Sequence, residues 1–295
     1  MEHFLMFKKM TNTKELYTNL KPFLDSIDYS VSGEAFSLLK NDEYDLLVTL
    51  PVPQNLSKYY ESASYISHSN SSKTLIDKIY QRVRKFTLQK KVKLINSFQT
   101  EDKTLLDLGC GTGDFLHQAQ RDGWTVTGIE PNEGARNLAT QKGVSVFVDL
   151  FEIKKRTYDV ISLWHVLEHV EDLDSYLNQL QKLLKPKGVL IVAVPNYKSY
   201  DASYYKKHWA AFDVPRHLWH FSQQSLRTLF LEKKMHVVKT LPMKFDAYYV
   251  SLLSEKYKSN KSNFLKAFSI GFISNLKARS SSEYSSLIYL IKNDK

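Results

Sequence analysis

The chain has 295 residues, 43% of them hydrophobic and 24% charged. This is the composition of an ordinary folded protein, and it excludes collagen-like, low-complexity and wholly disordered chains. The formal net charge of +10 is unevenly placed: residues 1–100 hold 14 basic and 10 acidic side chains, residues 101–195 hold 10 and 14, and residues 196–295 hold 17 and 7.

Cysteine content and hydropathy limit the class of protein further. The single cysteine, Cys110, excludes an internal disulfide and a zinc site made of cysteine pairs. No apolar run reaches the ~18 residues of a membrane span, and the opening residues lack the uncharged core of a signal peptide. We therefore expect a cytoplasmic protein without a transmembrane segment. The charge asymmetry would suit one ligand of cationic character and a second, anionic ligand, although a solvated surface explains it equally well.

Residues 1–69 are expected to form a small α+β N-terminal extension. A short helix is predicted near residues 13–26, and alternating apolar positions in YSVSGEAFSLL and DLLVTL predict strands, ended by Pro51 and Pro53. Residues 71–98 carry apolar side chains at helical spacing, which predicts one long helix. Its other face is a basic run that could bind nucleic acid, formed by Lys73, Lys78, Arg82, Arg84, Lys85, Lys90, Lys91 and Lys93.

Residues 70–295 are expected to form one α/β domain, because short apolar runs alternate with helical stretches. The predicted strands are KTLLDLG, TVTGIE, VSVFVD, YDVISLW, GVLIVAV, MHVVKTL and SSLIYLI. They predict a doubly wound, mostly parallel seven-stranded sheet with helices on both faces. A helix over residues 172–184 is predicted to end at KPKG. Residues 196–222 interrupt the alternation, and their many aromatic side chains predict a functional insertion on the substrate side.

A glycine-rich loop follows the first of these seven strands. LLDLGCGTGDFL places Gly109, Gly111 and Gly113 between a strand and a helix, where bare main chain can approach a ligand closely. Glu130 ends the next strand, 21 residues after Gly109, and a carboxylate at that distance can accept both hydroxyl hydrogens of an adenosine ribose. The loop and the carboxylate together indicate a cofactor that contains adenosine.

Charge separates the two adenosine cofactors that fit. The pyrophosphate of a nicotinamide dinucleotide favours a helix N-terminus without carboxylates. Here Asp107 and Asp114 bracket the loop, and Asp114 stands where the dinucleotide pattern has its third glycine. Carboxylates suit the sulfonium and the ammonium of S-adenosyl-L-methionine, so we predict that cofactor.

The motifs DLGCGTG, GIEP and YDVISLWHVLEHV resemble the class I S-adenosylmethionine-dependent methyltransferases, in the branch of ubiquinone-biosynthesis O-methyltransferases and similar small-molecule enzymes. The resemblance is strong over residues 100–195 and weaker through DVPRHLWHFSQQSL. It implies a seven-stranded sheet whose last strand is antiparallel. It implies that cofactor contacts come from Asp107, Gly109, Gly111 and Gly113 (methionine moiety and ribose), Glu130 (ribose hydroxyls), Asp149 (adenine amino group), Trp164 and His165 (methyl-donor pocket), with Cys110, Pro131 and Leu150 beside them.

The N-terminal extension is also similar to that of some relatives, whose cysteine pairs form a zinc ribbon before a segment like YYESASY. In this chain LLKNDEYD stands where those cysteines would be, so we expect no zinc there. Tyr59, Tyr60 and Tyr65 could close the pocket from the N-terminal side, and aromatic core packing explains them equally well.

HVLEH at residues 165–169 matches the H-x-x-E-H pattern of a zinc metalloprotease class, which needs both histidines on one helix face. A strand is predicted to end at Trp164, so His165 and His169 would straddle a turn, and we do not expect a protease. Ubiquinone-type relatives can carry acidic and histidine metal ligands around this turn. Because His165 stands where many of them have Glu, the sequence assigns no metal ligand.

Methyl transfer requires an aligned nucleophile and, where needed, a base that removes its proton. The candidate catalytic residues are His169, His217 and His220, with Asp213 able to orient a histidine; each histidine alone could equally be a packing residue. Arg216 could hold a carboxylate or phosphate of the substrate.

These observations predict a methyltransferase that transfers a methyl group from S-adenosylmethionine to a small-molecule acceptor, at oxygen, and the basic last third favours an anionic acceptor. Three alternatives stay open: an RNA or protein methyltransferase that uses the basic helix at 73–93, a non-catalytic cofactor-binding protein, and a nicotinamide oxidoreductase. Nucleic acid is not the expected partner, and the sequence leaves the oligomeric state open.

Overall fold

The computed structural model describes residues 13–60, 75–154, 156–259, 261 and 263–294. The chain divides into two compact units. Unit 1 contains Met1–Glu61, His165–Asn178 and Val192–Leu290, and unit 2 contains Ser62–Trp164, Gln179–Ile191 and Ile291–Lys295. The domain boundary expected near residue 69 lies outside the described residues, as does Tyr65.

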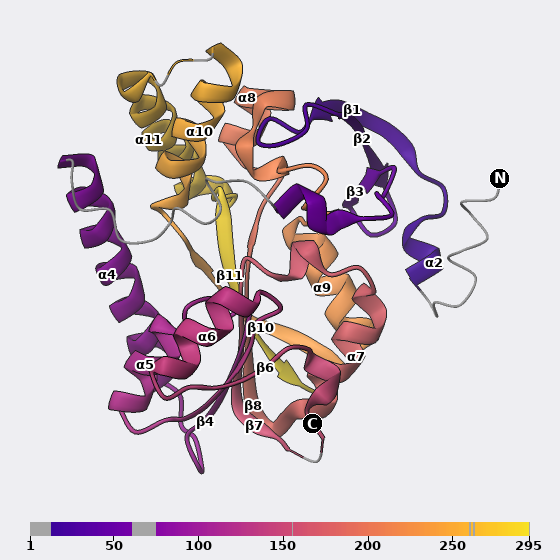
Figure 1. Cartoon of the computed structure of the whole chain (residues 1–295). Coiled ribbons are helices and arrows are strands. Elements are labelled where there is room, and N and C mark those ends of the chain that lie inside the picture. The colour runs from indigo at the N-terminus through magenta and orange to yellow at the C-terminus, as the bar shows by residue number, and fades with distance from the viewer. Residues whose placement is uncertain (1–12, 61–74, 155, 260, 262, 295) are drawn as a thin grey trace. The chain divides into compact units, whose positions relative to one another are not determined.

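A seven-stranded sheet has the order β10-β11-β8-β7-β4-β5-β6 (Figure 1). All seven predicted strands are present, as β4 (Thr104–Leu108), β5 (Thr125–Ile129), β6 (Ser145–Phe147), β7 (Tyr158–Trp164), β8 (Leu184–Pro195), β10 (Met235–Pro242) and β11 (Ser286–Asn293). β4 pairs in parallel with β5 and with β7, and β5 pairs in parallel with β6. Helices flank the sheet, so the predicted α/β fold class is confirmed.

The helices that alternate with these strands are α4 (Leu75–Asn96), α5 (Asp114–Arg121), α6 (Glu133–Gln141), α7 (Leu173–Leu183) and α9 (Gln223–Glu232). The helix predicted at 172–184 is α7, but KPKG opens β8 instead of forming a helix end. Pro186 disfavours the helical conformation at Lys185, and Lys185 forms ion pairs with Asp159 and Asp102 that anchor this extended segment.

The N-terminal part of unit 1 forms an antiparallel sheet of order β1-β2-β3-β9. It contains β1 (Lys21–Ile27), β2 (Ala35–Asn41), β3 (Leu46–Leu50) and, from the insertion, β9 (Trp219–His220). The predicted helix at 13–26 is wrong beyond α2 (Thr13–Leu16). Pro22 cannot continue a helix because it lacks the main-chain N–H, and β1 pairs along its length with β2.

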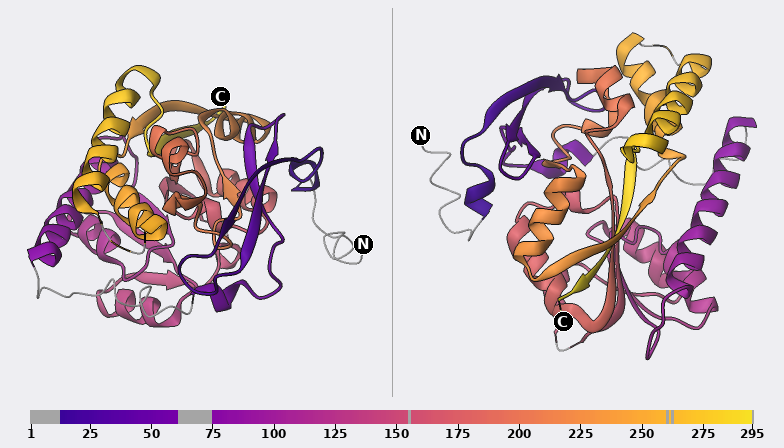
Figure 2. Two further views of the ribbon diagram at one scale, coloured as in Figure 1. Left: turned by 90° about the horizontal axis from the view of Figure 1, so that it is seen from above. Right: turned by 180° about the vertical axis from the view of Figure 1, so that it is seen from behind.

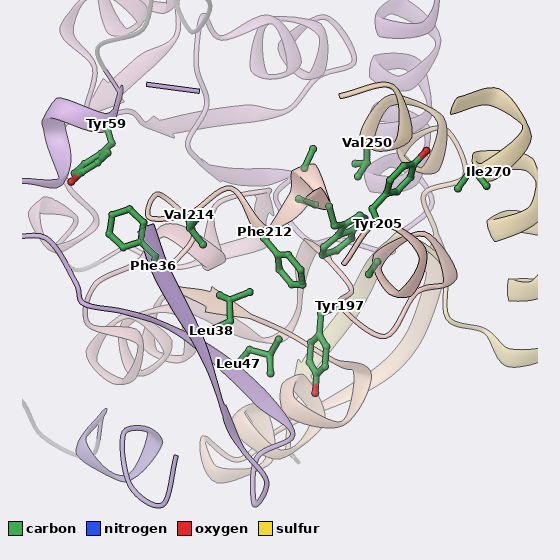
Figure 3. Packing of buried hydrophobic residues seen from close by; sticks show 14 residues of the cluster. Phe36, Leu38, Leu47, Tyr59, Tyr197, Tyr205, Phe212, Val214, Val250 and Ile270 are labelled. Carbon is green, nitrogen blue, oxygen red and sulfur yellow. The ribbon is translucent and has the colours of Figure 1, made fainter. Parts of the chain in front are cut away.

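Residues 196–222 fold as α8 (Tyr200–Tyr205), two short 3-10 helices (Lys206–His208 and Ala210–Phe212) and β9. Their aromatic side chains supply much of the core of unit 1 (Figure 3). Tyr197, Tyr205, Trp209 and Phe212 are buried in one cluster with Phe36, Leu38 and Leu47 of β2 and β3. Much of the aromatic character that predicted a functional insertion is therefore core packing.

Two further helices, α10 (Asp246–Ser259) and α11 (Phe264–Ser281), lie in the chain between β10 and β11 and pack side by side (Figures 1 and 2). Within the described part of the chain, no helix combines the length and the hydropathy needed to cross a membrane.

Candidate functional site

The glycine loop of unit 2 takes a conformation that requires glycine. Gly109, Gly111 and Gly113 have φ values of 65°, 54° and 75°, in the left-handed region that side chains disfavour. A Cβ on Gly113 would lie 2.8 Å from the Cβ of Ala139 in α6, so this glycine permits close packing. A Cβ on Gly111 would meet none of the described atoms within 4 Å. Gly111 therefore leaves main chain bare beside open space.

Glu130 lies directly beside this loop, as its spacing from Gly109 predicted. Its Oε2 accepts a hydrogen bond from the N–H of Gly111 at 2.8 Å, and its Oε1 accepts one from the N–H of Asn132 at 2.9 Å. Each carboxylate oxygen has a second lone pair, and the side chain is only partly buried. The carboxylate can therefore still accept hydroxyl hydrogens from a ligand at the loop.

Asp107 is buried at the end of β4, where Ser162 donates a hydrogen bond to its Oδ1 at 2.6 Å. Burial raises the pKa of Asp107 to about 7, although the bond from Ser162 and the charge of Lys91 oppose that shift. A cationic ligand nearby would favour the ionised carboxylate. Asp114, by contrast, forms an ion pair with Lys142 at 2.5 Å, so the charge argument for a cationic cofactor rests on Asp107 and Glu130.

Trp164 ends β7, and its indole nitrogen is buried. Lys91 lies over the indole ring, 4.2 Å from its centroid, and Phe115 packs edge-on against it. The buried Nε1 finds no hydrogen-bond acceptor among the described residues. A buried N–H without an acceptor is costly in a folded protein, and an acceptor on a ligand would satisfy it.

The remaining predicted cofactor residues have mixed surroundings. Asp149 is exposed and accepts a hydrogen bond from the N–H of Phe151 at 2.7 Å, which caps the short 3-10 helix that contains the buried Leu150. The carbonyl of Pro131 accepts a hydrogen bond from Arg136. Cys110 is a buried free thiol.

Gly128 supports the loop and was missed by the sequence analysis. A Cβ there would lie 2.6 Å from the Sγ of Cys110 and 3.0 Å from Leu116, so a larger residue would have to displace these side chains from the contact between β5 and the loop. A glycine inside a strand pattern often marks such a close approach, and TVTGIE carries that signal.

In unit 1, the half-buried His169 and the buried His217 have ring centroids 4.6 Å apart. The Nδ1 of His169 lies 3.0 Å from the carbonyl oxygen of Arg216 and 3.0 Å from the hydroxyl of Tyr60, and the Nδ1 of His217 lies 2.9 Å from the carbonyl oxygen of Ala211. A carbonyl only accepts, so each Nδ1 carries a hydrogen, and Nε2 is the nitrogen of each ring that can offer a lone pair. Burial and the charge of His217 lower the pKa of His169 to about 4, which keeps it neutral near pH 7.

Glu168 is buried beside these histidines. Its Oε1 lies 3.3 Å from the Nδ1 of His165, and its buried Oε2 has no hydrogen-bond partner in the described part of the chain. Burial alone would raise the pKa of Glu168, but the neighbouring histidines lower it. Ligand atoms of Glu168, His169 and His217 lie within 4.8 Å of one another.

These three residues could hold a divalent cation. Two histidines and a carboxylate are a common ligand set for such ions, and histidine ligands usually donate their other N–H to a carbonyl, as both do here. A cation at this position would act as a Lewis acid and lower the pKa of a bound hydroxyl. The ligand set includes His217, which the sequence did not connect with the turn at 165–169.

His165 has a different environment from His169. It has φ 58°, and its Nε2 lies 3.1 Å from Asp246. Burial favours its neutral form, but the bonds to Asp246 and Glu168 outweigh burial and raise the pKa of His165. His165 precedes the 3-10 helix Leu167–His169, so the two histidines of HVLEH do not share a helix face as the protease pattern requires.

Arg216, predicted to bind the substrate, and Asp213, predicted to orient a histidine, form hydrogen bonds within the protein. Arg216 donates from Nε and Nη2 to the two carboxylate oxygens of Asp213, from Nη1 to the carbonyl of Tyr59, and from Nη2 to Ser30. The structure therefore does not support the prediction that Arg216 binds an anionic group of the substrate. Asp213 Oδ2 lies 3.9 Å from His217 Nε2, beyond hydrogen-bond distance.

His220 is buried with its Nε2 2.9 Å from the hydroxyl of Thr49. Since that hydroxyl donates to the carbonyl of His217 at 2.7 Å, it accepts from His220. Burial lowers the pKa of His220 well below its usual value.

Comparisons with known proteins identify the family of the chain. Residues 80–236, more than half of the chain, match the family described as "Methyltransferase domain". Proteins named ubiquinone biosynthesis O-methyltransferase are similar: the one from Hydrogenovibrio crunogenus is 32% identical over 37% of this chain and 51% of its own length, and that from Bartonella bacilliformis is 27% identical over 48% and 63%. This chain thus spans about half to two thirds of these relatives.

Solved structures share the fold. Magnesium protoporphyrin IX methyltransferase from Synechocystis, solved with bound SAH, has a TM-score of 0.54 and 16% identity, covering 80% of this chain and 97% of its own. The StiE O-methyltransferase segment has a TM-score of 0.52 and 14% identity, covering 76% and 79%. With the family match over residues 80–236, these likenesses show that the chain belongs to the methyltransferase-domain family and has the class I methyltransferase fold.

Proposed function

We propose that this protein transfers a methyl group from S-adenosylmethionine to an oxygen atom of a small-molecule acceptor. The observation that carries the proposal is the glycine loop of unit 2, where the N–H of Gly111 is bonded to Glu130 and a Cβ on Gly111 would point into open space. The family match and the names of the relatives support the same reaction class.

The residues present fit this cofactor. Glu130 can accept the ribose hydroxyls, the bare main chain at Gly111 allows close approach, and Asp107 can offer a negative charge to the cationic methionine end. The buried Nε1 of Trp164 can donate to an acceptor on the ligand. S-adenosylmethionine supplies, when bound, a methyl group that is already activated by its sulfonium.

On the acceptor side, the proposed base is Nε2 of His169. The carbonyl of Arg216 fixes the tautomer that leaves this nitrogen with a lone pair, and the low pKa of His169 keeps it unprotonated near pH 7. Along the chain, only four residues lie between Trp164, which is predicted to line the methyl-donor pocket, and His169.

An oxygen acceptor is proposed because the similar curated proteins are named O-methyltransferases. The basic last third of the chain favours an acceptor with negative charge. RNA is the alternative acceptor, and the basic residues of α4 would bind it. One of these residues, Lys91, instead lies over the indole ring of Trp164.

The test incubates the purified chain with methyl-labelled S-adenosylmethionine and either a metabolite extract or bulk RNA, and identifies the labelled product by mass spectrometry. We expect label on a small molecule, as a methyl ether or ester. Label in RNA would overturn the choice of acceptor. Binding of S-adenosylhomocysteine without any labelled product would indicate a non-catalytic cofactor-binding protein.

A further inference from the structure

Helix α11 packs against α10 through its small residues. Its buried side is formed by Ala267, Ile270, Gly271, Ser274 and Ala278. A Cβ on Gly271 would lie 2.8 Å from the ring of Tyr248 and 3.0 Å from the carbonyl oxygen of Ala247, so the two helices are in close contact there. Apart from the buried Ile270, the large apolar residues of α11 keep much of their surface outside this contact, although Phe268 also packs against the ring of Tyr248 with centroids 5.1 Å apart.

That other side is strongly apolar and exposed to solvent. The exposed residues recur at helical spacing along α11 and are Phe264 (53% exposed), Leu265 (85%), Phe268 (63%), Phe272 (52%) and Leu276 (49%). We call these five residues the α11 apolar face. Single exposed apolar residues are ordinary, but a contiguous apolar stripe marks an interaction surface.

The charges around this face are almost all positive. Residues 244–279 contain only two acidic residues, Asp246 and Glu255, and both have internal partners: His165 for Asp246 and Lys266 for the buried Glu255. The seven basic residues of the same segment are Lys244, Lys256, Lys258, Lys261, Lys266, Lys277 and Arg279, and all except the partly buried Lys266 are exposed. We call these residues the basic rim; the segment that carries the apolar face thus has seven basic residues against two acidic ones, and both acidic residues are paired internally.

This combination selects one kind of partner. Helices that lie in a membrane interface insert large apolar residues below the headgroups, while flanking Lys and Arg contact anionic lipids. A second copy of this chain would bring two segments with the same excess of basic residues against each other, and like charges across an interface are unfavourable. We propose that the α11 apolar face and its basic rim dock this protein on the surface of an anionic phospholipid membrane.

The first experiment measures co-sedimentation of the full chain with phospholipid vesicles. We expect the chain to partition at least tenfold more strongly onto phosphatidylcholine vesicles that contain phosphatidylglycerol than onto vesicles of phosphatidylcholine alone, and 0.5 M NaCl to weaken this binding. The double variant Phe268→Ser/Phe272→Ser should lose it by at least tenfold. Phe151→Ser/Leu231→Ser is the matched control, because both residues are exposed but lie outside α11.

The second experiment locates the contact without removing apolar side chains. The native Cys110 is buried and is the only cysteine of the chain, so a cysteine at Leu265 can be labelled with an environment-sensitive dye. We expect the dye on Leu265→Cys to report an apolar environment when anionic vesicles are added, and the dye on the exposed control Lys187→Cys to remain in water.

Three results would overturn the proposal. One is equal partitioning of Phe268→Ser/Phe272→Ser and its control, with both variants folded by circular dichroism. Another is an unchanged dye signal at Leu265. The third is that the wild-type chain does not bind vesicles but self-associates in light scattering, and that Phe268→Ser/Phe272→Ser abolishes this self-association. That result would assign the α11 apolar face to contact with a second copy of the chain.

Discussion

The main-chain N–H of Gly111 donates a hydrogen bond to the carboxylate of Glu130 at 2.8 Å. This bond joins the loop after β4 to the end of β5, so the conformation of the loop and the position of the carboxylate depend on each other. Because the two strands pair in parallel, their carboxyl ends meet at the same edge of the sheet. The two most informative features of the sequence are thereby placed in one site.

Glu130→Gln should weaken binding of S-adenosylhomocysteine. A hydrogen bond to a charged group contributes about 1.5–3 kcal/mol, which corresponds to a roughly 10- to 100-fold increase in Kd. Isothermal titration calorimetry measures this change. Glu133→Gln is the matched control, because Glu133 is exposed in the first turn of α6. Equal affinity of the two variants would contradict the assigned role of Glu130.

Gly111→Ala and Gly143→Ala should destabilise the protein similarly but differ in ligand binding. Both glycines have positive φ, 54° and 80°, and a Cβ at either position meets no described atom within 4 Å, so each alanine costs about 1–2 kcal/mol of backbone strain. Only the Cβ at Gly111 would enter the proposed cofactor space. We expect similar decreases in Tm and loss of S-adenosylhomocysteine affinity for Gly111→Ala alone; retained affinity would contradict the loop assignment.

The sequence predicted the features that depend on local pattern. The seven strands follow from apolar runs, and the loop with Glu130 follows from glycine spacing and from parallel pairing, which repeats the same geometry at each strand end. Gly128 could also have been predicted, since glycine inside a strand indicates close approach of another segment.

The features that the sequence did not reveal depend on partners far along the chain. Lys142 neutralises Asp114, Asp246 binds His165, and Arg216 is held by Asp213 and Ser30. Spacing along the chain does not specify such pairs. For the same reason the helix predicted to residue 26 is wrong, because β1 is formed by pairing with β2, a contact that the local apolar pattern does not encode.

The affinity for S-adenosylhomocysteine should increase from pH 6 to pH 8. Burial raises the pKa of Asp107 to about 7, so the carboxylate becomes fully charged only above that pH, and the ammonium of the ligand favours the charged form. Asp107→Asn should flatten this pH dependence in calorimetric titrations. A wild-type affinity that is constant over this range would count against a role for Asp107.

The raised pKa of Asp107 also makes the stability of the folded protein depend on pH. The unfolded carboxyl ionises near pH 4 and the folded one near pH 7, so the contribution of Asp107 to stability is complete below pH 4 and decreases as the pH rises to 7. Relative to wild type, Asp107→Asn should therefore gain stability between pH 4 and pH 7 in denaturant titrations. The opposite slope would show that the folded carboxyl is ionised more easily than the unfolded one.

His169→Gln should lower kcat and leave the Kd for S-adenosylhomocysteine unchanged. The expected decrease in kcat is about 10²- to 10⁴-fold, the usual contribution of a general base. The Kd should not change, because His169 belongs to unit 1 whereas the glycine loop belongs to unit 2. With a pKa of about 4, His169 should also cause no loss of activity between pH 6 and pH 8. The assay uses the labelled product identified from the metabolite extract. His236→Gln, at an exposed histidine of β10, is the control, and equal kcat for both variants would remove His169 from the mechanism.

A metal-binding experiment can test whether Glu168, His169 and His217 hold a divalent cation. One ligand atom from each of these residues lies within 4.8 Å of the others, and the buried Oε2 of Glu168 has no hydrogen-bond partner among the described residues, so chelator-treated protein should bind about one equivalent of Co²⁺ with visible absorption bands. Glu168→Gln should abolish these bands, and the exposed Glu171→Gln should preserve them. If Glu168→Gln binds Co²⁺ as wild type does, the cation lies elsewhere. A cation bound to Nε2 of His169 would occupy the lone pair of the proposed base and so exclude that role; if wild type binds no Co²⁺, the three residues hold no cation and His169 keeps the role of base.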